Sequence, residues 1–224
     1  MSLTHCFFDL DGTLVENVEH VIDAYLESLD ALCLPLTTRS HLRNIQGLSF
    51  ETTAEAIGVP EHLLADFSDI FWEKMATFTT PPLVLPGVME LLNHLKQSNI
   101  SCSIVTNNRS YIAANACKIA GLDSFFDYYL GSDLVEPKPN PEGICALCKK
   151  YDIDPSEKVL FVGDSVSDLG AAMNAKVQGI CVVEEKDFKV RFTDDVMEDF
   201  ERHNFKFEHF VDCFELTNYL KNLN

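Results

Sequence analysis

The chain has 224 residues, of which 46% are hydrophobic and 23% are charged, as in a typical soluble globular protein. Its formal net charge of −18 argues against nucleic acid or an anionic membrane as a partner, because both require a basic surface. No apolar run is long enough to span a bilayer, and we expect no signal peptide. Eight cysteines without a secretory context indicate reduced thiols, so we expect a cytoplasmic protein.

The first apolar segment, residues 3–10, is predicted to be a buried strand that ends at two aspartates. Asp9 and Asp11 lie two positions apart, so their side chains point the same way in an extended chain. Two converging carboxylates repel each other and attract a cation. Because hard oxygen ligands suit Mg²⁺, we expect a magnesium site here.

Residues 16–81 are predicted to form an all-helical unit. Apolar side chains recur at helical spacing in residues 18–32, 40–45, 49–57 and 63–75, and Pro35 ends the first helix. No strand pattern interrupts this region. We therefore expect a helical domain of residues 16–81 inserted into a core domain made of residues 1–15 and 82–224.

Strands and helices alternate after residue 86, as in a parallel sheet with helices on both faces. The predicted strands are residues 100–105, 125–130, 158–164, 179–183 and 205–211. The predicted helices are residues 88–95, 111–120, 144–151, 168–175 and 214–220, with a short amphipathic helix in the charged segment 184–204. The fold class is therefore α/β, and ligands should bind beyond the carboxyl ends of the strands.

Polar side chains stand where three of the apolar strands end: Asp9 with Asp11, Thr106, and Asp164. A turn residue would explain any one of them. It does not explain all three together with Lys138, which is held between two prolines. We therefore interpret the set as one functional site, in which Lys138 supplies the positive charge that the acidic surface lacks.

Together these residues resemble the four signature motifs of the haloacid dehalogenase-like hydrolase superfamily. The motifs are residues 9–13 (DLDGT), Thr106, Lys138 and residues 163–168 (GDSVSD), in the family's order. The resemblance implies a Rossmann-like parallel sheet and a helical cap. A helical insertion directly after the first strand resembles the phosphoglycolate phosphatase and β-phosphoglucomutase branch.

The resemblance also implies a role for each acidic residue. Asp9 would be the nucleophile that forms an aspartyl-phosphate, and the Asp11 side chain would be the acid–base group. Mg²⁺ would be held by Asp9, Asp164 and the main-chain carbonyl of Asp11. Asp168 would orient metal-bound water or Lys138.

Phosphate binding is the second part of the implied site. Thr106 and the main-chain N–H groups of Gly12 and Asn107 would hold the phosphoryl oxygens. Lys138 would both bind the phosphoryl group and neutralise its charge during catalysis.

The residue types also separate the reactions known in the family. The aspartate at position 11 favours phosphoryl transfer over carbon–halogen cleavage. Phosphonate hydrolysis in the family uses a Schiff-base lysine from the cap, and the only lysine in residues 16–80 of this sequence is Lys74, which makes that reaction a weak candidate. The mutase pattern has a basic residue where this chain has Phe50. We therefore expect a phosphatase that hydrolyses a small phosphorylated metabolite: a phosphoglycolate-, sugar phosphate- or nucleotide-type monoester.

Two alternatives stay open: a phosphosugar mutase of the β-phosphoglucomutase type, and a non-enzymatic regulatory protein that binds a phosphate ligand on the same fold. Arg43 and Gln46, in the predicted cap, are candidates for substrate contact. The sequence decides neither the substrate nor the oligomeric state.

Overall fold

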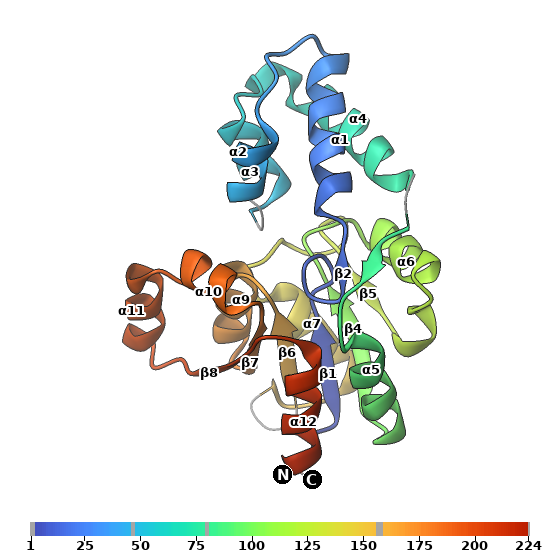
Figure 1. Cartoon of the computed structure of the whole chain (residues 1–224), viewed down its shortest axis with the longest axis vertical. Coiled ribbons are helices and arrows are strands. Elements are labelled where there is room, and N and C mark those ends of the chain that lie inside the picture. Colours follow the sequence, from blue (N-terminus) through green and yellow to red (C-terminus); the bar gives the residue numbers. More distant parts are fainter. Residues whose placement is uncertain (1–2, 46–47, 79–80, 156–158, 224) are drawn as a thin grey trace.

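The computed structural model describes residues 3–45, 48–78, 81–155 and 159–223. Six parallel strands form its central sheet, in the order β5-β4-β1-β6-β7-β8 (Figure 1). The strands are β1 (His5–Phe8), β4 (Ser101–Val105), β5 (Tyr129–Leu130), β6 (Val159–Gly163), β7 (Gln178–Val182) and β8 (Phe207–Phe210). The predicted α/β class is confirmed.

Strand β1 lies inside the sheet, between β4 and β6. Its side chains point alternately to the two faces of the sheet, and both faces are buried. Cys6 and Phe8 belong to the apolar cluster on one face, and Phe7 belongs to the cluster on the other. The first face is covered by α5 (Val88–Gln97), α6 (Ser110–Ile119) and α12 (Cys213–Leu223), and the second by α7 (Glu142–Tyr151) and α9 (Val166–Ala175). Among the described residues, no helix is long and apolar enough to cross a bilayer.

We call residues 16–81 the helical insertion, and its described helices lie beyond the carboxyl ends of the strands (Figure 1). They form α1 (Val18–Ala31), α2 (Arg39–Asn44), α3 (Phe50–Ala56), a short 3₁₀ helix (Glu61–Leu63) and α4 (Leu64–Ala76). Their apolar side chains make a cluster of their own, which Ile112 of α6 joins. The boundary between a cap domain and a core domain stays a prediction.

A two-stranded antiparallel ribbon connects the helical insertion to the sheet. Its strands are β2 (Val15–Glu16) and β3 (Leu83–Val84), and Val15 pairs with Val84. Two residues are too few to produce a strand pattern, so the sequence did not predict this ribbon.

Two other segments differ from the sequence-based expectation. Residues 184–204 form two helices, α10 (Glu185–Arg191) and α11 (Asp194–Arg202), because the chain turns inward at Phe192, whose side chain is buried against the sheet. Residues 125–130 contain only the short β5, and a 3₁₀ helix (Asp123–Phe125) precedes it. In both segments some of the apolar residues are packed in the protein interior, but they do not all belong to the single helix or strand that the sequence predicted.

The core of the helical insertion gives a stability prediction. Phe67 is fully buried and stacks with Tyr25 and Phe50 at centroid distances of 6.2 and 5.9 Å. Phe67→Ala leaves a cavity, so the free energy of unfolding should fall by about 3–5 kcal/mol. Urea denaturation followed by the fluorescence of Trp72, the only tryptophan, measures this change.

The matched control is Leu36→Ala, since the Leu36 side chain is 62% exposed. It should change the free energy of unfolding by less than about 0.5 kcal/mol. Equal losses in the two variants would contradict this assignment of the core.

Candidate active site

Asp9 and Asp11 directly follow β1, at its carboxyl end. The Asp9 N–H donates to the carbonyl of Val162 at 2.8 Å, which ties this turn to β6. Gly12 has a φ of +90°, and a Cβ at this position would lie 2.7 Å from Asp164 Oδ2. Only glycine therefore allows the chain to turn this close to the neighbouring carboxylate.

Asp164 and Asp168 come from the carboxyl end of β6 and the first turn of α9. Asp168 Oδ2 accepts the N–H of Ser165 at 2.9 Å and that of Asp164 at 3.2 Å, and the Ser165 hydroxyl accepts the N–H of Asp168 at 3.3 Å. This reciprocal capping box fixes the fully buried Asp168 at the start of the helix.

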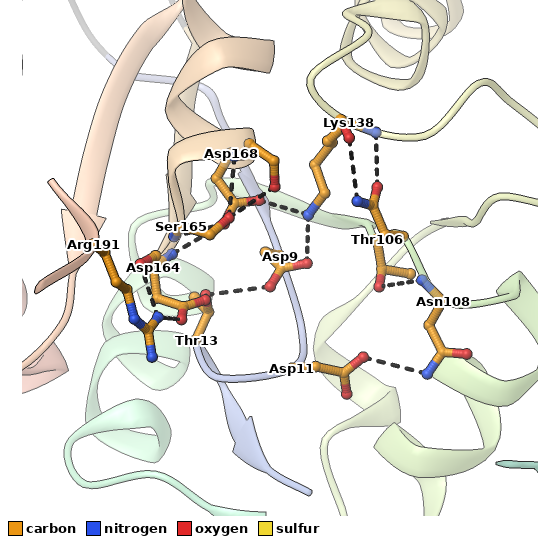
Figure 2. Close-up of polar contacts among 12 residues, drawn as sticks. Asp9, Asp11, Thr13, Thr106, Asn108, Lys138, Asp164, Ser165, Asp168 and Arg191 are labelled. Carbon is orange, nitrogen blue, oxygen red and sulfur yellow. Dashed lines mark hydrogen bonds and ion pairs between the residues drawn. The ribbon is translucent and has the colours of Figure 1, made fainter. Parts of the chain in front are cut away.

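Lys138 reaches the site from the loop before α7. Its Nζ lies 2.5 Å from Asp9 Oδ1 and 2.6 Å from Asp168 Oδ1, and the side chain is buried (Figure 2). Burial lowers the pKa of the Lys138 ammonium, but the ion pairs with Asp168 and Asp9 outweigh this effect and leave the pKa raised. The lysine therefore stays charged between two carboxylates.

Asn107 holds the lysine loop in place. The N–H of Lys138 donates to Asn107 Oδ1 at 2.7 Å, and Asn107 Nδ2 donates back to the carbonyl of Lys138 at 3.2 Å. The end of β4 is thus tied to the loop that carries the lysine. The sequence-based role of Asn107 was a main-chain contact to phosphate, so this side-chain role was missed.

Asp11 is held by two side-chain amides. Asn17 Nδ2 donates to Asp11 Oδ1 at 2.6 Å, and Asn108 Nδ2 donates to Asp11 Oδ2 at 3.3 Å. Burial raises the pKa of the Asp11 carboxyl, and the hydrogen bonds from Asn108 and Asn17 offset only part of this rise. A fixed carboxyl with a raised pKa is suited to transferring protons.

Two predicted phosphate-binding groups are engaged within the protein. The Gly12 N–H donates to the carbonyl of Val15 at 2.8 Å, so the structure differs from the expectation that it binds a phosphoryl oxygen. The Thr106 N–H donates to the carbonyl of Leu130 at 2.9 Å, and its Oγ1 accepts the N–H of Asn108 at 3.0 Å. The hydroxyl proton of Thr106 is left as a donor to a ligand.

Arg191, at the end of α10, forms an ion pair with the Asp164 carboxylate (Figure 2). It also donates to the main-chain carbonyl of Asp164 at 3.0 Å. Burial raises the pKa of Asp164 to about 6, Asp168 adds to the rise, and Arg191 and Thr13 oppose it. Sequence reasoning missed Arg191 because residues 184–204 carry no strand-end signal.

The donor set fits a divalent cation. Asp9, Asp164 and Asp168 each offer a carboxylate oxygen, and these oxygens lie within 4.8 Å of one another. Burial raises the pKa of Asp9 well above its usual range; Lys138 lowers it, and the neighbouring carboxylates raise it further. With Asp11 included, four carboxylates share two cations, Lys138 and Arg191, in the part of the chain that the structure describes, so two negative charges lack a cationic partner there. Hard oxygen ligands of this charge suit Mg²⁺.

Most of these groups line one pocket of about 140 Å³ between the sheet and the helical insertion, whereas Asp168 and Thr13 are buried and do not line it. Asp9, Asp11, Thr106 and Lys138 line its floor, and the helical insertion supplies its other walls. The guanidinium of Arg109 packs over the ring of Trp72, 4.7 Å from its centroid, which adds a contact between α6 and α4 beside this pocket.

Of the two cap residues proposed for substrate contact, Arg43 is among the described residues and Gln46 is not. Arg43 pairs with Glu19 on an exposed face and is absent from the pocket lining, so the geometry does not favour its predicted role. Gln46 lies outside the described residues. Sequence reasoning also missed several residues that hold the site together: Thr13, Asn17, Asn108, Ser165 and Arg191. Asn108 could have been found, since it follows Thr106 at the same strand end.

Comparisons with known proteins agree with this geometry. The family model for haloacid dehalogenase-like hydrolases matches residues 6–182. The probable phosphatase IndB of Dickeya dadantii is 33% identical over 184 residues, which cover 78% of this chain and 79% of that protein. A phosphoglycolate phosphatase of Vibrio vulnificus is 30% identical over 185 residues, covering 75% of this chain and 78% of that protein.

Solved structures show the same fold. A haloacid dehalogenase-like hydrolase from Streptococcus pneumoniae superposes with a TM-score of 0.76 at 19% identity, covering 97% of this chain and 98% of that one. The family model spans well over half of this chain and includes Asp9, Thr106, Lys138 and Asp164. The chain therefore belongs to the haloacid dehalogenase-like hydrolases.

Proposed function

We propose that this protein is a Mg²⁺-dependent phosphatase that hydrolyses a small phosphorylated metabolite through an aspartyl-phosphate on Asp9. The observation that carries the proposal is the placement of Asp9 beside Lys138, with Asp11 facing the same pocket. The relatives described above bear phosphatase names, which supports the same reaction. Phosphoglycolate-, sugar phosphate- and nucleotide-type monoesters all contain the bond that this chemistry breaks.

In the proposed mechanism, each step is assigned to one residue. A carboxylate oxygen of Asp9 attacks phosphorus, the bond from phosphorus to the leaving oxygen breaks, and Asp11 gives that oxygen its proton. Asp11 then takes a proton from a water molecule that attacks the phosphorus, which releases inorganic phosphate and restores Asp9. Lys138 stays charged and offsets the negative charge of the phosphoryl group.

The cation and the helical insertion complete the proposal. Asp9, Asp164 and the main-chain carbonyl of Asp11 would hold Mg²⁺, which would supply positive charge to offset the negative charge of the phosphoryl group. Asp168 positions Lys138, to which it is bonded at 2.6 Å. Residues 16–81 act as a cap that excludes water from the pocket, on a core of residues 1–15 and 82–224.

Removing the nucleophile tests the covalent mechanism. Asp9→Asn should lower kcat for an aryl phosphate by at least about 10⁴-fold, because the neutral amide cannot attack phosphorus. Phosphate release measures the rate. The exposed Asp195→Asn, on α11, is the control and should keep full activity. Full activity of Asp9→Asn would rule out an aspartyl-phosphate.

Asp11→Asn tests the division of roles between the two aspartates. It should lower kcat by about 10²–10⁴-fold, because no group remains to protonate the leaving oxygen. The Mg²⁺ affinity, measured by calorimetry, should change by less than about tenfold, since only the main chain of Asp11 would hold the metal. A loss of affinity as large as that of Asp164→Asn would show that the Asp11 side chain is a metal ligand.

Metal binding should depend on pH through Asp164, whose pKa burial raises to about 6. Above this pH the carboxylate is ionised and Mg²⁺ meets no competing proton. Below it a proton must leave before the metal binds, so the affinity should fall by up to about tenfold for each pH unit. Calorimetric titrations one unit above and one unit below that pKa measure the difference. An affinity that is independent of pH would contradict the assignment of Asp164 as a ligand.

Chelation of the metal by EDTA should abolish turnover, and adding Mg²⁺ back should restore it.

A further inference from the structure

The part of the pocket that lies beyond the phosphate-binding floor is apolar. The helical insertion lines it with aliphatic and aromatic side chains, among them Val21, Ile22, Leu42, Phe50, Phe71 and Trp72. Five of these six are buried, with exposures between 2% and 8%. In the position where the mutase pattern has a basic residue, Phe50 packs against the ring of Trp72 at a centroid distance of 5.5 Å.

Most of the polar groups on this wall already have partners. The Tyr25 hydroxyl hydrogen-bonds to the side chain of Thr53, and Asn17 Nδ2 donates to Asp11, while the buried Asn17 Oδ1 has no hydrogen-bond partner among the described residues. The described polar side chains that the helical insertion adds to the lining are these three: Asn17, Tyr25 and Thr53. A substrate rich in hydroxyl groups would therefore lose several hydrogen bonds to water and find one acceptor, Asn17 Oδ1, on the described part of this wall.

The cations of the helical insertion point away from the pocket. Arg39 pairs with Glu19 and Asp23 at 2.6 Å each, and Lys74 pairs with Glu27 at 2.8 Å. As described above, Arg43 is likewise committed to Glu19. None of the three lines the pocket, and residues 46, 47, 79 and 80 are Gln, Gly, Thr and Thr in the sequence, so they add no cation.

From these observations we infer that the substrate is a phosphate monoester whose organic part is a compact apolar group, without a second anionic group. The inference rests on the proposed phosphatase function and specifies its substrate. The whole pocket has about 140 Å³, polar floor included, and an apolar cavity of about 150 Å³ holds a molecule of the size of benzene, so the organic part of the ester must be compact. A single aromatic ring would pack against Phe71 and Trp72 at the usual aromatic distances. A carboxylate or second phosphate, as in phosphoglycolate or a sugar bisphosphate, would meet no cation on the described part of the wall that the helical insertion forms, and Arg191, which also lines the pocket, is already paired with Asp164.

Three esters with similar leaving groups test the inference: benzyl phosphate, para-methylbenzyl phosphate and para-carboxybenzyl phosphate. Their leaving oxygens are chemically alike, so differences in kcat/KM report on the pocket. The methyl ester should be turned over within a few-fold of the benzyl ester, whereas the carboxylate should lower kcat/KM by at least about tenfold. Phosphoglycolate should also be a poorer substrate than benzyl phosphate. Equal or better turnover of the carboxylate-bearing esters would overturn the inference.

A pair of variants tests whether the missing cation is the cause. Leu48 lines the pocket and is 45% exposed, so Leu48→Arg adds a positive charge there without disturbing a buried core. It should raise kcat/KM for para-carboxybenzyl phosphate relative to benzyl phosphate by about tenfold. Leu36→Arg, an exposed position outside the pocket lining, should leave the ratio unchanged. The same ratio in both variants would overturn the inference.

Binding without turnover separates this inference from the proposed function. Trp72 is the only tryptophan and lines the pocket, so its fluorescence reports occupancy. In the Mg²⁺-loaded Asp9→Asn protein, benzyl phosphate should bind at least about tenfold more tightly than inorganic phosphate or phosphoglycolate. Equal affinities would show that the apolar wall has only a structural role and does not bind the substrate. That result would overturn the inference and would not affect the proposed phosphatase function. Tight binding of benzyl phosphate to a wild-type protein that hydrolyses no ester would instead reject the phosphatase and retain the apolar pocket.

Discussion

The ion pairs of Lys138 with Asp9 and Asp168 are the interaction on which the rest of the site depends. Three buried charges share one small volume, and a buried carboxylate is stable in its ionised form only with a partner. The lysine satisfies both carboxylates at once, so its position sets the distance between the strand that carries Asp9 and the helix that carries Asp168. Removing the Lys138 ammonium would leave two buried carboxylates uncompensated, at a cost of about 3–5 kcal/mol or more.

Each member of this triad is fixed by a separate local device. The turn after β1 holds Asp9, the capping box of α9 holds Asp168, and Asn107 after β4 holds the loop of Lys138. All three devices stand at the carboxyl ends of neighbouring parallel strands, where the main chain leaves the sheet and its polar groups become available. The sheet therefore acts as the rigid frame of the site, and the loops supply the chemistry.

Features that depend on neighbouring residues, or on a regular spacing of apolar residues, could be predicted from the sequence. The buried strands, the helices of the insertion and the polar residues at strand ends were all predicted, because hydrophobic periodicity and turn residues report directly on burial. The family motifs then placed Asp9, Thr106, Lys138 and Asp164 in one site. Arg191 could not be predicted in this way, because its contact with Asp164 depends on how α10 packs on the sheet edge, and packing between distant segments leaves no periodic trace.

Side-chain partners were equally hard to predict. Arg43 had the right charge and stood near the predicted site in sequence, yet Glu19 of α1 takes its guanidinium on the exposed face. Two acidic residues of α1, Glu19 and Asp23, form ion pairs with the arginines of α2. These pairs depend on how the two helices pack against each other, which the sequence does not reveal. The character of the pocket wall followed from the same packing, since the cations turned outward and the aromatic residues turned inward.

The β2–β3 ribbon has a consequence for how such a protein can change over evolution. The chain leaves the sheet through Glu16 and returns through Leu83, and these two residues are paired in the ribbon. The exit and the return thus lie side by side, so the intervening segment can lengthen, shorten or be replaced without moving any strand of the central sheet. Under the proposed function, reaction chemistry and ligand preference would be encoded in separable stretches of the gene, and a new preference could arise by exchange of one stretch while the other stays intact.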